Sequence, residues 1–139
     1  MIAFDTDVLT EILQGDDVFV ARASVIPVAE QAVPIIVLEE ILRGRLNIVR
    51  QAEAGKAKIS LERAYQLLQD VLNDFRQVKV LPYTSQAESL YHQWQQQKIR
   101  VSPHDLRIAA ICVTHDATLI SRNRRDFQRV PGLMVEFWA

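Results

Sequence analysis

Short apolar runs alternate with longer amphipathic stretches along this chain, and this alternation constrains the fold more than any other feature. Runs of strand length, rich in aliphatic residues, lie at positions 2–4, 33–37, 78–81, 118–120 and 134–137. Between them, apolar residues recur three or four positions apart, which is the spacing of one helix face. Strands that alternate with helices predict βαβ units. We therefore expect an α/β fold, with a mostly parallel central sheet of about five strands flanked by helices.

Capping residues predict where the helices begin. Side chains suited to the N-cap are Thr6 or Asp7, Ser60, Ser85 and Ser102. A further helix is expected from Leu38, with Leu46 on its apolar face, and the helix after Ser60 is expected to use Leu61, Tyr65 and Leu72 in the same way. The chain has only four Gly and five Pro, and it shows no internal repeat or linker. One domain spanning residues 1–139 is expected.

Composition excludes several classes of protein. The single cysteine, Cys112, lies in an apolar run, so we expect a buried thiol with neither a disulfide nor a cysteine zinc site. No apolar stretch approaches the roughly 20 residues of a membrane span, and the first residues lack the basic region of a signal peptide. A cytoplasmic protein without a membrane partner is expected. The net charge of −1 argues against coating of nucleic acid through bulk charge.

Four acidic residues from separate parts of the sequence are expected to meet at one edge of the sheet. Asp5 ends the first predicted strand, and Glu40 lies in the first turn of the helix after the second. Asp105 lies in the first turn of the helix before the fourth strand, and Asp126 follows that strand. In an open α/β sheet, ligands bind outside the carboxyl ends of the strands. Asp7, two residues past the first strand, is a secondary member of the group.

Such a group of acids needs a counter-charge. Two carboxylates about 4 Å apart repel by roughly 4 kcal/mol at an effective dielectric constant near 20. Either some of them are protonated, or a cation lies between them. Carboxylate oxygens suit Mg²⁺ or Mn²⁺, and a pair of such ions can activate a water and stabilise the leaving oxygen of a phosphodiester. The acids therefore predict hydrolysis of a nucleic-acid backbone.

Arginine dominates the basic residues, since it supplies twelve of the 16. Several arginines crowd the loop after the fourth strand, and Arg122, Arg124 and Arg125 are candidate phosphate contacts. A guanidinium fork suits phosphate better than an ammonium group does. The near-neutral net charge is thus compatible with a local basic rim around an acidic site.

Each of these residues also has a simpler structural interpretation. Asp5 fits a helix cap, Glu40 a solvated helix position, and Asp105 a first-turn acid that interacts favourably with the helix dipole. Asp126 fits an exposed turn, and the arginines fit a solvated charged loop. The three histidines show no mutual ligand spacing, so surface or capping roles are expected for them.

Four motifs in order, together with a short segment after the last of them, resemble the PIN domain, and more narrowly the VapC-type toxins of prokaryotic toxin–antitoxin pairs. They are the segments 4–9 (FDTDVL), 40–44 (EILRG), 105–110 (DLRIAA), 118–127 (TLISRNRRDF) and 130–133 (VPGL). The resemblance runs nearly from end to end. It departs from the family pattern at Asp7, where Asn is common, at Ser121, where Thr is usual, and at Val37, where a hydroxyl residue is common.

The resemblance implies an endoribonuclease that depends on Mg²⁺ or Mn²⁺. It places the catalytic metal site on Asp5, Glu40, Asp105 and Asp126. Thr6, Ser121 and Asn123 match the polar positions that support this site. Family members commonly form homodimers, and a small VapB-type antitoxin that binds DNA holds them inactive. An RNA substrate, an antitoxin partner and a homodimer are therefore expected.

Other functions remain open from the sequence. The chain resembles a haloacid-dehalogenase-type phosphatase in the segment Asp5-Thr6-Asp7, where the first Asp would be a nucleophile. Leu9 stands where that family has Thr or Val, and the later acidic pair is missing. A PIN nuclease that processes RNA outside a toxin pair is a second alternative. A degenerate PIN module that only binds its partner is a third.

Overall fold

Five short parallel strands form the centre of the protein, in the order β3-β2-β1-β4-β5, in a computed structural model that describes residues 1–138. The strands are β1 (Ile2–Phe4), β2 (Gln31–Pro34), β3 (Lys79–Leu81), β4 (Thr118–Ser121) and β5 (Val135–Phe137). Their number and parallel direction confirm the predicted α/β class.

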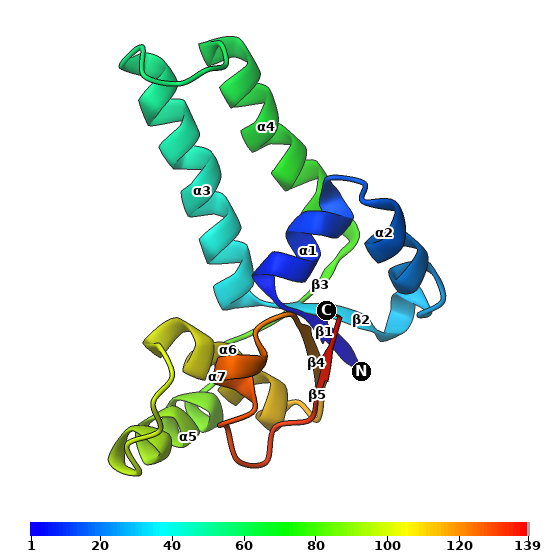
Figure 1. The fold of residues 1–139 in the computed structure, drawn as a ribbon, viewed down its shortest axis with the longest axis vertical. Helices are drawn as coiled ribbons and strands as arrows, with labels where there is room; N and C mark the ends of the chain where they lie inside the picture. The colour runs from blue at the N-terminus through cyan, green and yellow to red at the C-terminus, as the bar shows by residue number, and fades with distance from the viewer. Residues whose placement is uncertain (139) are drawn as a thin grey trace.

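Seven α-helices and two 3₁₀ turns connect the strands of the described chain. They are α1 (Thr6–Leu13), α2 (Asp17–Ser24), η1 (Val28–Glu30), α3 (Ile35–Glu53), α4 (Leu61–Asp74), η2 (Phe75–Gln77), α5 (Ser85–Gln96), α6 (Pro103–Thr114) and α7 (Arg124–Phe127). The elements α1, α2 and the α3–α4 hairpin lie on one side of the sheet, and α5, α6 and α7 lie on the other (Figure 1). No helix in residues 1–138 combines the length and apolar character needed to cross a bilayer.

The strand order explains this division of the helices. From β1 the chain moves outward through β2 to β3, and it then returns to the other side of β1 to form β4 and β5. Because crossovers between parallel strands are right-handed, reversing the direction transfers the connecting helices to the opposite face. The carboxyl ends of β1 and β4 therefore form the switch point at which open α/β sheets bind ligands.

Helix α6 provides much of the core beside this switch point. Its residues Ile108, Ala109, Ala110, Ile111 and Cys112 are fully buried. The apolar run that contains the cysteine is thus a core helix, and the predicted burial of the Cys112 thiol is confirmed. Burial raises the pKa of this thiol to about 12.

The second strand lies earlier than the sequence predicts. It covers Gln31–Pro34, and the β-branched residues that follow it begin α3. Ile36 and Val37 are buried against the core from the first turn of this helix, and that burial overrides their preference for strands. Glu40 consequently lies in the second turn of α3, one turn later than expected.

Two helix caps also differ from the prediction. Asp5 itself caps α1, since its side chain accepts a hydrogen bond from the Thr6 amide. Thr84, one residue before the predicted Ser85, caps α5 through the amide of Ala87. The predicted caps Ser60 and Ser102 are confirmed.

The α3–α4 hairpin buries less apolar surface than its pattern suggests. Leu46, Leu61, Tyr65 and Leu72 are all exposed, whereas Val71 is buried in the core. The hairpin projects beyond the sheet (Figure 1). The apolar residues of the hairpin that lie away from the sheet therefore have no core to pack against.

Candidate active site

Asp5 is the central acid of the site, and both of its carboxylate oxygens have hydrogen-bond donors. Oδ1 accepts from the Thr6 amide at 2.8 Å, and Oδ2 accepts from the Ser121 hydroxyl at 2.7 Å. The Asp5 amide continues the pairing of β1 with β4 by donating to the carbonyl of Ile120 at 2.9 Å. Only 5% of Asp5 is exposed. The carboxylate is therefore fixed between the ends of the two central strands.

Glu40 reaches the same region from α3. Its Oε2 accepts a hydrogen bond from the Thr6 hydroxyl at 3.1 Å. Thr6 thus contacts two acids, one through its amide and one through its side chain. The neighbouring Glu39 instead pairs with the exposed Arg43 at 3.0 Å, so Glu40 is the glutamate that reaches Thr6.

Asn123 joins the two acids on the other side of the site. Its side-chain nitrogen donates to Asp126 at 3.0 Å and lies 3.5 Å from a carboxylate oxygen of Asp105. Its side-chain oxygen caps α7 by accepting from the Asp126 amide at 3.3 Å. The Asn123 amide donates to the Ser121 hydroxyl at 3.0 Å. Through Ser121, this group is continuous with Asp5.

Burial and mutual repulsion set the electrostatics of the site. The pKa of Asp5 is raised to about 7, mainly by burial; the charges of Asp7 and Asp105 contribute to this rise, and the hydrogen bonds from the Ser121 hydroxyl and the Thr6 amide oppose it. Burial also raises the pKa of Asp105, where the Ser102 hydrogen bond opposes it and the charges of Glu40, Asp126 and Asp7 add to it. The predicted acids therefore act on one another as a single electrostatic group.

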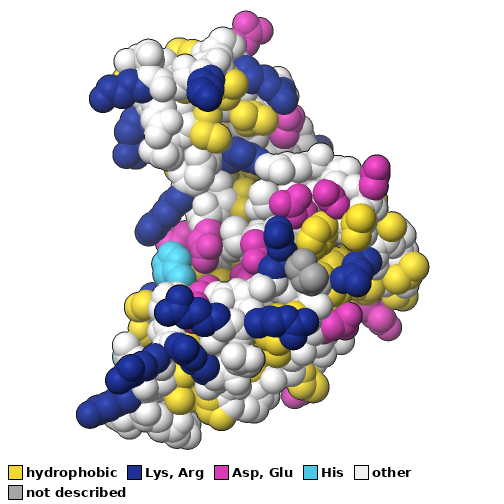
Figure 2. Space-filling model, in the orientation of Figure 1, with side chains coloured by type: hydrophobic (Ala, Val, Ile, Leu, Met, Phe, Trp, Pro, Cys, Tyr) yellow, Lys and Arg dark blue, Asp and Glu magenta, His cyan; other side chains and the backbone are white. Residues whose placement is uncertain are grey.

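His104 is the residue of this region whose position the sequence did not indicate. Its Nδ1 lies 3.5 Å from Glu40, and its Nε2 lies 3.7 Å from Glu39. This contact joins the start of α6 to α3. Because the two segments are far apart in the sequence, no local spacing of residues predicts it. Figure 2 shows a histidine beside acidic side chains in the hollow below the helical hairpin. No Lys or Arg in residues 1–138 forms an ion pair with Asp5, Glu40, Asp105 or Asp126.

The donor chemistry of the site suits a hard divalent cation. It consists of carboxylate and hydroxyl oxygens, which Mg²⁺ and Mn²⁺ prefer. A cation would also compensate the buried charge of Asp5. As the side chains stand, no three acidic, histidine or cysteine residues within positions 1–138 form a complete metal cage. The fit therefore rests on the kind of ligands and on their uncompensated charge.

The three predicted phosphate-binding arginines have different surroundings. Arg125 lines a cleft together with Asp126. The Arg122 guanidinium lies 3.5 Å from Glu11 and 5.5 Å from the ring centre of Phe19. Arg124 lies 4.7 Å from the ring centre of Phe137. Of the three, Arg125 is the one that shares a cleft with an acid of the site.

Comparison with known proteins defines the class of the fold and the site. The family model described as PIN domain matches residues 2–133, so this chain belongs to the PIN domain family. The Ribonuclease VapC1 of Rickettsia felis is 29% identical, over 73% of this chain and 88% of that protein. The Ribonuclease VapC of Rickettsia bellii is also 29% identical, over 72% and 70% of the two chains. The predicted resemblance to VapC-type ribonucleases is confirmed.

Solved structures show the same fold. A chain of FitAcB from Neisseria gonorrhoeae aligns with a TM-score of 0.76 at 19% identity, covering 97% of this chain and 96% of that one. A chain of VapBC2 from Rickettsia felis, bound to a DNA fragment from its promoter, aligns with a TM-score of 0.74 at 20% identity over the full length of both.

Proposed function

We propose that this protein is an endoribonuclease of the VapC kind, which uses Mg²⁺ or Mn²⁺ to hydrolyse RNA phosphodiester bonds. The observation that carries this proposal is the connected group of four acids at the switch point of the sheet. Asp5, Glu40, Asp105 and Asp126 come from four segments, and Thr6, Ser121 and Asn123 link them by hydrogen bonds. Membership of the PIN domain family supports the same assignment.

In this proposal the four acids hold the ion or ions. A bound divalent cation supplies an activated water and compensates negative charge on the leaving oxygen. The other residues position the acids: Ser121 and the Thr6 amide orient Asp5, and Asn123 orients Asp105 and Asp126. Asp7 adds negative charge to the group without a hydrogen bond to the other acids, since its side chain accepts from the Val8 amide.

RNA cleavage provides the direct test. Wild-type protein is expected to cleave RNA with Mg²⁺ or Mn²⁺ and to lose this activity in EDTA. Asp5→Asn is expected to abolish cleavage. Asp116→Asn is the matched control, because Asp116 is exposed and precedes β4 at the opposite edge of the sheet. Cleavage without a metal, or an active Asp5→Asn variant, contradicts the proposal.

A VapB-like antitoxin and a second copy of this chain are the proposed protein partners, and the proposed location is the cytoplasm. The similar folds named VapBC2 and FitAcB support an antitoxin by analogy. Exposed apolar residues on α2 and at its C-cap, on η1 and on the hairpin offer surface for such contacts; they are Val18, Val25, Val28, Leu46, Leu61, Tyr65 and Leu72. Co-purification with the product of a short neighbouring reading frame tests the antitoxin. Sedimentation of the isolated protein tests the dimer.

A further inference from the structure

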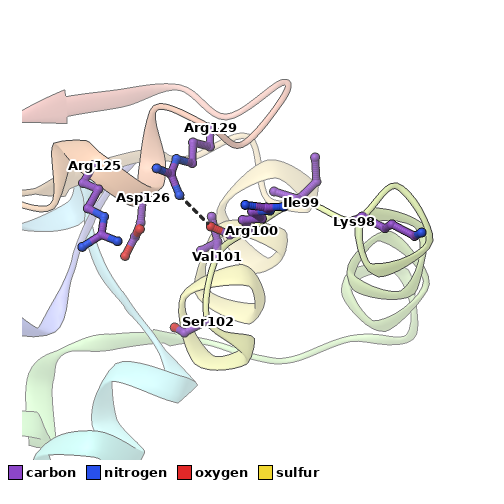
Figure 3. A pocket seen from close by; sticks show the side chains of 8 residues that line it. All are labelled: Lys98, Ile99, Arg100, Val101, Ser102, Arg125, Asp126 and Arg129. Carbon is purple, nitrogen blue, oxygen red and sulfur yellow. Dashed lines mark hydrogen bonds between the residues drawn. The ribbon is translucent and has the colours of Figure 1, made fainter.

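We propose that a basic cleft beside Asp126 binds the RNA strand on one side of the phosphate to be cleaved. The cleft is lined by Lys98, Ile99, Arg100, Val101, Ser102, Arg125, Asp126 and Arg129, and its volume is about 610 Å³ (Figure 3). This inference rests on the proposed function, because it assumes that RNA is the substrate. It adds a subsite, formed by Lys98, Arg100, Arg125 and Arg129, for the strand that flanks the cleavage point.

Two segments that are distant in sequence form the cleft. The loop between α5 and α6 supplies Lys98 and Arg100, whereas α7 and the turn after it supply Arg125 and Arg129. Arg129 donates a hydrogen bond to the backbone carbonyl of Arg100 at 3.1 Å and so ties the two segments together. In Figure 3 the cations extend from Arg125, next to Asp126, across to Lys98 on the far side.

The four cations are available to an anionic ligand. All four side chains are exposed. None of them forms an ion pair with a carboxylate within residues 1–138. Asp126 is the single acid in the lining, so the cleft carries an excess of positive charge. Arg122 differs, since it already lies against Glu11.

The lining suits a polynucleotide strand better than a single phosphate. Three of the four cations are arginines, whose guanidinium groups form paired hydrogen bonds with phosphate oxygens. A row of cations matches the succession of phosphates along one strand. The half-buried side chains of Ile99 and Val101 lie among the charges and offer apolar surface to ribose or base.

The cleft is continuous with the acidic site. Asp126 lines the cleft and also shares Asn123 with Asp105. Ser102 lines the cleft and caps the helix that carries Asp105. A nuclease acts on one phosphate, and the neighbouring phosphates of the strand must lie beside it. The cleft supplies cations at this position, which favours RNA over an acidic peptide as its occupant.

Binding of single-stranded RNA in EDTA tests the cleft separately from cleavage. The test variant is Lys98→Gln/Arg100→Gln. Within residues 1–138 neither side chain forms a hydrogen bond or an ion pair, and Arg129 contacts only the backbone carbonyl of Arg100. Each lost phosphate contact is expected to lower the slope of log K against log salt by about 0.7. The double variant is therefore expected to bind roughly 25-fold more weakly at about 0.1 M salt, with the slope reduced by about 1.4.

Two further variants control for charge and folding. Arg50→Gln/Lys56→Gln removes the same charge from the far end of the hairpin, where both residues are exposed, and is expected to bind as wild type does. Lys98→Arg/Arg100→Lys keeps the charge and is expected to retain most of the affinity. Thermal unfolding of each variant establishes that it is folded.

Several results would overturn the assignment. One is wild-type affinity and salt slope in the cleft variant, and another is an equal loss in the hairpin control. A polyglutamate peptide that binds as tightly as RNA, and loses affinity in the same variant, would assign the cleft to an acidic protein segment. If binding depends on the cleft but no metal-dependent cleavage occurs, the proposed function fails, and the cleft remains an RNA-binding site without a role beside a cleaved phosphate. Cleavage by wild type without cleft-dependent binding refutes the cleft alone.

Discussion

Asp5 carries a buried charge whose cost depends on pH. Burial raises its pKa to about 7, whereas the unfolded value is 3.8. Between these values the folded protein holds a proton that the unfolded chain has released. The stability from this proton is fully present below about pH 4 and is lost as the pH rises through about 7. In the absence of metal, the ionised form of Asp5 therefore destabilises the fold.

Asp5→Asn is expected to remove this pH dependence. An asparagine keeps the acceptor for the Thr6 amide but has no charge. From about pH 5 to about pH 8, wild type should lose roughly 3 kcal/mol of unfolding free energy relative to the variant, since one pKa unit corresponds to about 1.4 kcal/mol. Urea unfolding of both proteins in EDTA measures this difference. An equal difference at both pH values would contradict the assigned shift.

Ser121 is expected to act through Asp5. Its hydroxyl donates to Asp5 at 2.7 Å and holds the pKa of that carboxyl down. Ser121→Ala should raise the pKa of Asp5, move the acidic limb of the pH–activity profile upward, and weaken metal-dependent cleavage about 10- to 100-fold. Ser24→Ala is the control, because that hydroxyl contacts only the carbonyl of Ala21. An unchanged pH profile in Ser121→Ala would remove Ser121 from this role.

At the scale of elements, helix α4 separates buried from exposed apolar residues within one turn. Val71 is 2% exposed and Leu72 is 60% exposed. Val71→Ala is expected to cost about 2 kcal/mol of unfolding free energy because it leaves a core cavity. Leu72→Ala should cost less than about 0.5 kcal/mol. Chemical denaturation of the two variants measures both values, and a larger loss for Leu72→Ala would show that its side chain is covered in the isolated protein.

The sequence predicted the existence of the strands better than it predicted element boundaries or the exposure of apolar residues. Alternation gave the number and approximate places of all five strands, although the second strand lies earlier than predicted and β3 and β5 are only partly buried. The boundary between β2 and α3 could not be predicted, because Ile36 and Val37 suit either a strand or a buried helix turn. The exposure of Leu72 was also missed, since an apolar stripe does not reveal whether a neighbouring element covers it.

Part of the candidate site could be predicted from the sequence, because the carboxyl ends of parallel strands lie at the same edge of the sheet. Asp5 and Asp126 follow strands, so their meeting follows from a parallel sheet. The contact of His104 with Glu40, and the cleft formed by Lys98 with Arg129, join segments that are adjacent only after folding. No spacing along the sequence encodes such contacts.

At the scale of the whole molecule, a net charge of −1 conceals two local fields of opposite sign. The connected acids form one field, and the cations around the cleft form the other. The two fields adjoin at Asp126, yet no Lys or Arg within residues 1–138 forms an ion pair with the four acids, so the opposite charges do not neutralise each other locally. Each field therefore determines its own ligand: a cation for the acids and phosphates for the basic cleft.

Divalent cations are accordingly expected to stabilise the folded protein. An ion that binds only the folded state adds about 2.7 kcal/mol at a hundredfold excess over its dissociation constant. For a domain of this size, that corresponds to a rise of roughly 10 °C in Tm. Thermal unfolding in MgCl₂ is compared with KCl at equal ionic strength, which leaves general screening unchanged. Asp116→Asn should keep the rise and Asp5→Asn should lose most of it, because only Asp5 lies within the connected acids; an equal rise in both variants would place the stabilising ion elsewhere.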